Sequence, residues 1–140
     1  MPITPDHAGR TYPPTPPYEV THVKIRELAT ALGDGPAYDR LFAVAPPTFG
    51  VVVASPAWDA LFTDPELDLQ LSRIVHADQQ FRYVRPLAAE DVVTATLRID
   101  KVRVRGPVEI ISTSVEVHDE LDEHVLTATS TFVHTREESA

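Results

Sequence analysis

Residues 45–62 read APPTFGVVVASPAWDALF, a nearly continuous apolar run on which the fold depends. A helix with no polar face belongs inside a protein, and this run, interrupted by Pro56 and Asp59, is too short to span a bilayer. Its prolines and Thr48 form a helix start signal. The β-branched residues 51–53 and Pro56 instead favour a buried strand followed by a short helix. We interpret the run as a buried, bent helix, because the segments after it have the pattern of strands, and a curved sheet needs an apolar element to cover its concave face.

The composition indicates one globular domain and argues against several kinds of partner. At 140 residues, 43% of them hydrophobic, the chain can bury a substantial core. Its 21 acidic and 12 basic residues give a formal charge of −9, which argues against nucleic acid or an anionic membrane as the main partner. The absence of cysteine excludes disulfides, thiolate nucleophiles and zinc–thiolate sites. Residues 1–10 lack the apolar core of a signal peptide, so we expect a cytoplasmic location.

The chain before the apolar run predicts an arm and one amphipathic helix. Six prolines within residues 1–17 are typical of an extended arm, which is either a loosely packed leader or a dimer contact. Thr21 can cap a helix over residues 22–32, and Gly33 is placed to end it. The apolar stripe of this helix has helical spacing and consists of Ile25, Leu28, Ala29 and Leu32.

The second half of the chain predicts four strands. Apolar and polar residues alternate in runs over residues 75–83, 93–104, 111–117 and 126–133. In the first run the alternation puts His76 on one polar face together with Asp78, Gln80 and Arg82. In the second run the alternation changes parity near Asp100, which predicts a β-bulge. Turns are expected at residues 106–107 and 119–123.

This order of elements predicts an α+β hot-dog fold, in which a long curved antiparallel sheet wraps around one central apolar helix. We expect the strands to form an antiparallel meander. The hot-dog domain is expected over residues 18–135, between the arm of residues 1–17 and a charged tail of residues 136–140. Such a sheet leaves an exposed edge on each monomer, so two hot dogs are expected to pair edge to edge.

The start of the central helix is the first candidate for chemistry. The N–H groups of Thr48, Phe49 and Gly50 lack intrahelical acceptors and lie at the positive end of the helix dipole. They can bind a carbonyl oxygen as it gains negative charge, and Gly50 allows a ligand to approach closely. Alternatively, these donors meet only water or a capping hydroxyl. The sequence has no phosphate-binding loop, dinucleotide motif, nucleophile elbow or helical histidine pair, so neither a cofactor nor a metal is expected.

An ordered set of short segments carries a family resemblance. The segments are residues 18–20, 24–27, 33–34, 45–49, 75–87 with Asp91, 117–120 and 123–125. On these the chain resembles the MaoC-like dehydratase N-terminal group, kin of the actinobacterial (3R)-hydroxyacyl thioester dehydratase subunits. The likeness covers residues 10–135. It implies a hot-dog fold, an acyl thioester of coenzyme A or acyl carrier protein as ligand, and a homodimer or a heterodimer with a catalytic MaoC-like subunit. Because of the acidic charge, we expect no nucleic acid and no membrane partner.

The loop over residues 33–38 departs from the pattern of the active members. Active hydratases of this kind use an Asp and a His in a Gly-Asp-x-Asn-Pro-x-His loop to position a water and move its protons across the 2,3-double bond. Asp34 matches the Asp, but the Asn is missing, the loop is one residue shorter, and Tyr38 stands where the His would be. Tyrosine, with a pKa of about 10, is an inefficient general base near neutral pH. The resemblance therefore implies a subunit that is weakly active or non-catalytic and that shapes the acyl tunnel for a catalytic partner.

His76 has two interpretations. It lies either at a dimer seam or tunnel wall near the partner's site, or on a polar sheet face as a structural histidine whose ring Asp78 orients. Two other functions remain open for the chain as a whole. One is thioester hydrolysis, using Asp34 or a sheet carboxylate together with the helix N-terminus. The other is an acyl-binding module without turnover.

Overall fold

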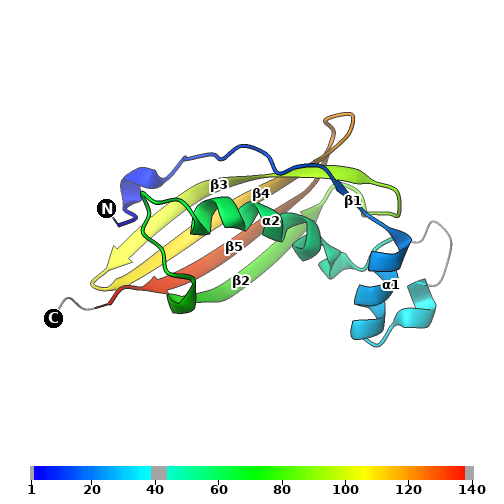
Figure 1. Ribbon diagram of the computed structural model, residues 1–140, viewed down its shortest axis with the longest axis horizontal. Helices are drawn as coiled ribbons and strands as arrows, with labels where there is room; N and C mark the ends of the chain where they lie inside the picture. The colour runs from blue at the N-terminus through cyan, green and yellow to red at the C-terminus, as the bar shows by residue number, and fades with distance from the viewer. Residues whose placement is uncertain (1, 39–43, 138–140) are drawn as a thin grey trace.

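The structure, a computed structural model, describes residues 2–38 and 44–137. An antiparallel sheet curls around helix α2, which lies across one of its faces (Figure 1). The helices are α1 (His22–Ala31) and α2 (Gly50–Phe62), with single turns η1 (Pro5–His7), η2 (Gly35–Tyr38), η3 (Pro47–Phe49) and η4 (Leu71–Arg73). The strands are β1 (Tyr18–Glu19), β2 (Ile74–Tyr83), β3 (Val92–Arg105), β4 (Val108–Asp119) and β5 (His124–Thr135).

The strands have the order β1-β3-β4-β5-β2, which corrects the predicted meander. Strands β3, β4 and β5 do follow one another as hairpins, because the turns between them are too short for any other arrangement. Strand β2, however, pairs with β5 at the far side of the sheet and not with β3. The connection over residues 84–91 is longer and contains Pro86, so it does not force its two strands to be neighbours.

The predicted central helix is confirmed. η3 leads directly into α2, and Phe49 and Gly50 both have helical dihedral angles at the junction. The helix continues through Pro56, and its buried residues are Gly50, Val53, Ala54, Ala57 and Leu61. Thr48 is exposed and does not cap the helix. The face that points away from the sheet, with Pro56 and Asp59, is exposed in the single chain.

The core lies between α2 and the concave face of the sheet. The side chains at its centre come from alternate positions of three strands and include Leu97, Ile99, Ile111, Val115, Leu126, Ala128 and Phe132. Apolar burial of this kind contributes about 25 cal/mol per Å², so each large side chain here supplies roughly 2 kcal/mol. The predicted alternation of β4 and β5 is thereby confirmed, because alternate residues of both strands are buried.

Helix α1 follows the predicted capping pattern. The N–H of Lys24 donates to the Thr21 hydroxyl at 3.1 Å, and Gly33 has a φ of +85° just past the helix end. Ile25 and Ala29 are buried, whereas Leu32 is 52% exposed because the helix already ends at Ala31. The apolar stripe is therefore shorter than the spacing predicted.

The N-terminal arm packs along β3. Ile3 is buried and its N–H donates to the Leu67 carbonyl at 3.1 Å. Further along the arm, the N–H groups of Gly9, Tyr12 and Thr15 donate to carbonyls of β3 at 2.7, 3.0 and 2.9 Å. The arm thus covers the β3 edge of the sheet. Among the described residues, the other edge, formed by β2, has no strand beside it.

Candidate functional site

The N-terminal end of α2 meets the aromatic end of β2. The N–H of Gly50 donates to the Tyr83 hydroxyl at 3.1 Å, and that hydroxyl donates in turn to the carbonyl of Pro47. Burial raises the pKa of Tyr83, and the hydrogen bond from Gly50 offsets this only in part. The phenol is therefore neutral at physiological pH and can keep both hydrogen bonds. It occupies the place at which the sequence predicted a ligand carbonyl.

Gly50 is required by this contact. A Cβ atom added to it would lie 2.7 Å from Cδ1 of Phe81 and 2.9 Å from the Tyr83 hydroxyl. These separations are shorter than van der Waals contact, so only glycine lets β2 approach the helix so closely. Here the close approach is made by the chain's own aromatic residues and not by a ligand.

The three predicted donors differ in their availability. The N–H of Phe49 donates to the Pro46 carbonyl at 2.8 Å, and that of Gly50 is used by Tyr83. Thr48 is exposed at the start of the helix. The helix end is consequently more closed than the sequence led us to expect, because two of the three N–H groups already have acceptors.

A cavity of about 480 Å³ opens beside this helix end. Its walls are mostly apolar and consist of Val44, Ala45, Pro47, Tyr83, Val84, Arg85 and Pro86. Val44 and Val84 are 51% and 67% exposed, which is high for apolar side chains. The volume falls in the range of small-molecule sites, and apolar walls with one charged group suit a ligand that has an aliphatic part and a polar end.

Arg85 lies at the polar side of the cavity and is held by two carboxylates. Its guanidinium is 2.9 Å from Asp91 and 3.3 Å from Asp119. The backbone N–H of Glu123, followed by Arg85, holds the pKa of Asp119 below its ordinary value, and Asp91 raises the pKa of Arg85. This cluster fixes the end of β2 against the start of β3 and the β4–β5 turn. Arg85, Asp91 and Asp119 all belong to the segments that carry the family resemblance.

The predicted catalytic loop lies in a different place from this cavity. Asp34 is exposed in the turn after α1, where its N–H donates to the Ala29 carbonyl at 2.8 Å. A second cavity, also of about 480 Å³, adjoins the loop and is lined by Arg26, Thr30, Gly33, Gly35 and Pro36. No lining residue that the structure describes is shared by the two cavities, although α1 and η2 lie at the end of the molecule where α2 begins (Figure 1). Tyr38 ends η2, and its side chain is outside the described part of the structure.

His76 lies on the opposite face from the predicted one. A β-bulge between His76 and Asp78 shifts the register of β2, so His76 is opposite the inward-facing Phe132 and Asp78 is opposite the outward-facing Thr131. The ring of His76 packs edge-on against Trp58, with ring centroids 5.1 Å apart, and its Nε2 lies 3.1 Å from Oε1 of Gln79. Asp78 therefore does not orient His76. The histidine remains exposed at the free edge of the sheet, on the side of α2.

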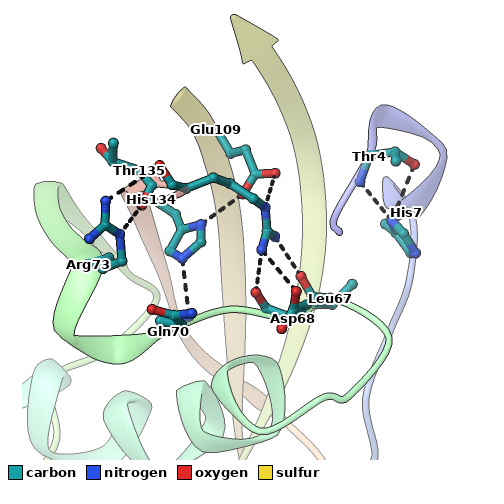
Figure 2. Close-up of polar contacts among 10 residues, drawn as sticks. Thr4, His7, Leu67, Asp68, Gln70, Arg73, Glu109, His134 and Thr135 are labelled. Carbon is teal, nitrogen blue, oxygen red and sulfur yellow. Dashed lines mark hydrogen bonds and ion pairs between the residues drawn. The ribbon is translucent and has the colours of Figure 1, made fainter. Parts of the chain in front are cut away.

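A buried charge network at the other end of the sheet was not predicted (Figure 2). Glu109 and His134, which are 3% and 1% exposed, are joined at 2.8 Å, and Arg136 lies 2.9 Å from the same carboxylate. The N–H of Gln70 donates to Nε2 of His134 at 3.1 Å, and Arg136 donates to the Leu67 carbonyl at 2.8 Å. All these groups are used by internal partners. The network therefore fastens the segment after α2 to the sheet and offers no open site.

Known proteins similar to this chain identify its family. The family model described as the FAS1-like, dehydratase domain region matches residues 6–128. The chain belongs to this family. The chain is 53% identical over 139 residues to a UPF0336 protein of Cutibacterium acnes, and the match covers 99% of this chain and 98% of that protein. It is 43% identical to a UPF0336 protein of Streptomyces coelicolor, covering 94% and 95% of the two chains.

Comparison with solved structures confirms that the chain has the hot-dog fold. A MaoC-like dehydratase superimposes with a TM-score of 0.80 at 23% identity, covering 93% of this chain and 42% of that chain. The HadBC (3R-hydroxyacyl-ACP dehydratase) complex of Mycobacterium tuberculosis gives 0.74 at 25% identity, covering 91% and 97%. The ChsH1–ChsH2 complex of the same organism gives 0.58 at 14% identity, covering 91% and 86%. The predicted MaoC-like resemblance is thereby confirmed.

None of the described helices is both long enough and apolar enough to cross a membrane.

Proposed function

We propose that this chain is a hot-dog subunit of a (3R)-hydroxyacyl thioester dehydratase, a hydro-lyase, and that it is itself weakly active or non-catalytic. The observation that carries the proposal is the closed helix end. Tyr83 takes the Gly50 N–H that would stabilise a thioester oxyanion, and Tyr38 replaces the general-base histidine of active relatives. With the Gly50 donor occupied and the histidine base replaced, proton transfer across the 2,3-double bond is slow.

The cavity beside Tyr83 supports a role in acyl binding. Its apolar walls can bury an aliphatic chain, and Arg85 at its margin can face the polar part of a thioester. The ligand we propose is an acyl thioester of coenzyme A or of acyl carrier protein, as the family resemblance implies. In this role the subunit shapes the acyl tunnel while its partner performs the chemistry, in the cytoplasm.

The free edge of β2 and the uncovered face of α2 support a paired assembly. The edge carries the exposed apolar residues Leu71 and Val75, and the outer face of α2 carries Ser55 and Pro56. An unpaired edge strand next to a half-covered apolar helix is stabilised by a second hot dog. HadBC and ChsH1–ChsH2 are complexes with the same fold, which favours a heterodimer with a catalytic MaoC-like subunit over a homodimer.

Hydration of crotonyl-CoA tests the proposal. The purified chain should hydrate crotonyl-CoA little, and Asp34→Ala should change that rate little. Co-expression with a hot-dog protein that has the intact Asp…His loop should yield a complex with strong activity. Robust hydration by the chain alone that disappears in Asp34→Ala would overturn the proposal.

The same incubation separates the two other functions. Thioester hydrolysis releases free coenzyme A thiol, which a thiol reagent detects, whereas hydration does not. An acyl-binding module would retain a long-chain acyl-CoA with no turnover, alone and with the partner. Tyr83 at the helix end favours the second of these alternatives over hydrolysis, because hydrolysis also needs a stabilised oxyanion.

A further inference from the structure

Four cations form one row on the outer face of β3. Residues 98–105 contain four of the twelve basic residues of a chain whose formal charge is −9. These are Arg98, Lys101, Arg103 and Arg105, here called the cationic row, and all four are exposed. Within the described residues, none of the four side chains forms a hydrogen bond or an ion pair with the chain.

The β-bulge between Ile99 and Lys101 creates this row. Arg98 is opposite Ser114 and Lys101 is opposite Ser112, so the two cations occupy successive outward positions although they are three positions apart in sequence. Without the bulge, Lys101 and the two arginines after it would point toward the core. Outward positions on a strand repeat about every 7 Å, so the row is about 20 Å long.

An apolar strip runs away from the row across the same face. Ile110 is opposite Arg103, Val133 is opposite Ile110, and Val75 is opposite Val133. All three point outward, and Val75 is 63% exposed. A charged row beside a partly exposed apolar strip is the composition of a protein-docking surface, in which the apolar part is covered and the charges select the partner.

We propose that the cationic row and this strip dock an acidic protein, the carrier that presents the acyl thioester. The inference rests on the proposed function and selects carrier protein over coenzyme A. Coenzyme A has its phosphates close together, whereas the row extends over about 20 Å and lies away from the cavity. A protein surface with several carboxylates matches that length. Nucleic acid is disfavoured because the remainder of the chain is strongly acidic.

The position of the row suits delivery to the partner subunit. The row lies across from the first half of β2, at the end of the sheet opposite α1 (Figure 1). Two edge strands related by a two-fold axis pair antiparallel, so this half of β2 lies beside the second half of the partner's edge strand. A carrier on the row is then about three strand spacings, roughly 14 Å, from the seam at which the partner's helix begins.

Steady-state kinetics of the two-subunit complex test the surface. Arg103→Glu and Arg105→Glu should each raise KM for crotonyl-acyl carrier protein by about fivefold, with kcat unchanged and no effect on crotonyl-CoA. Raising the salt concentration should weaken wild-type use of the carrier substrate and reduce the difference between wild type and variants. Lys24→Glu is the matched control, because it makes the same charge change on exposed helix α1.

Two outcomes overturn the docking surface. One is an unchanged KM for the carrier substrate in the Arg103→Glu/Arg105→Glu variant. The other is an equal loss with both substrates, which would place the effect on folding or assembly. If the wild-type complex hydrates neither substrate, the proposed function has failed. The surface is then tested by anisotropy of labelled acyl carrier protein, and it is overturned if the double variant binds as tightly as wild type or if wild type prefers a DNA duplex.

Discussion

At the residue scale, the Gly50–Tyr83 contact controls what the end of α2 can bind. A helix N-terminus has unsatisfied N–H groups and a positive dipole end, and both attract a polarised carbonyl. In this chain the phenol of Tyr83 accepts from Gly50 and donates to Pro47, so it satisfies both the donor and a neighbouring acceptor. A thioester oxygen would have to displace a neutral, half-buried phenol to reach the same N–H. The chemistry of the site is therefore limited by an internal hydrogen bond.

Gly50→Ala should destabilise the chain by about 1–3 kcal/mol, because the added methyl group would overlap the Phe81 ring. Urea unfolding followed by circular dichroism measures this loss. The matched control is the same substitution in a Phe81→Ala background, where the overlap with the ring is removed and only the close approach to the Tyr83 hydroxyl remains. Coupling between the two sites should make Gly50→Ala less costly there. An equal cost in both backgrounds would show that the Phe81 ring is not what requires glycine at this position.

At the element scale, the bulges in β3 and β2 show how much of the sheet the sequence could predict. The bulge in β3 was predicted because strongly apolar residues, Ile99 and Val102, lie on either side of it and reveal the change of parity. The bulge in β2 has no such signal. Val75 is apolar but points outward, and Ala77 is too small to mark a face. The face of His76 was therefore predicted wrongly.

The candidate site was predictable only in part, for a related reason. Alternation placed Tyr83 correctly on the inner face, and the proline pair marked the start of the central helix. Their contact depends on how α2 lies against an edge strand, which no local pattern determines. The pairing of β2 with β5 likewise depends on tertiary packing, since the connection after β2 is too long to fix its neighbour. Local periodicity predicts elements, whereas contacts between distant elements come from packing.

Arg10 and Tyr12 of the arm donate hydrogen bonds to Asp64, which lies just after α2. This contact, here called the clamp, should make stability depend on pH. Burial alone would raise the pKa of Asp64, but hydrogen bonds from Tyr12 and Arg10 outweigh it and hold the pKa below its ordinary value. A carboxylate with a lowered folded-state pKa adds stability above its unfolded pKa, about 4, and loses that stability as the pH falls through the folded value. We expect the free energy of unfolding to decline below about pH 4.

Asp64→Asn should remove part of this decline and cost about 1 kcal/mol at pH 7. Thermal unfolding between pH 2.5 and 7 measures both effects. Asp119, whose pKa is also lowered, leaves a residual pH dependence. Asp59→Asn, on the exposed face of α2, is the control and should follow the wild-type curve. If the stability of Asp64→Asn fell with pH as steeply as that of wild type, the clamp would not contribute to the pH dependence.

Disrupting the charge network of Figure 2 should lower the free energy of unfolding by more than loss of the clamp does. Glu109→Ala removes the shared partner of His134 and Arg136 in a buried setting, so it should cost about 3–5 kcal/mol. Glu109→Gln keeps the shape and one acceptor and should cost less. Chemical denaturation of the three proteins ranks them. If Glu109→Ala lost no more than 1 kcal/mol, the network would not be what holds the segment after α2 on the sheet.

At the scale of the whole molecule, the described part of a single chain leaves one edge of its sheet and one face of its central helix uncovered. The arm closes the sheet at β3, while β2 at the other side has no strand beside it among the described residues. The uncovered face of α2 and the exposed ring of His76 lie along that same open side. One partner surface can therefore cover the edge, the helix face and the histidine together. In a two-fold pair of β2 edges, such an interface would place the acyl cavity of one subunit beside the first half of the other subunit's β2.

Ser55→Arg tests this assembly, because a long charged side chain on the outer face of α2 would separate two packed helices. The single chain should tolerate the change, since Ser55 is only partly buried in it. Light scattering after size exclusion should show a shift from dimer to monomer, with far-UV circular dichroism unchanged. Val23→Arg, at a 63% exposed position of α1, should remain dimeric. A Ser55→Arg protein that stays dimeric would place the interface elsewhere. The shared acyl tunnel, on which the proposed dehydratase role depends, could then not lie at this face.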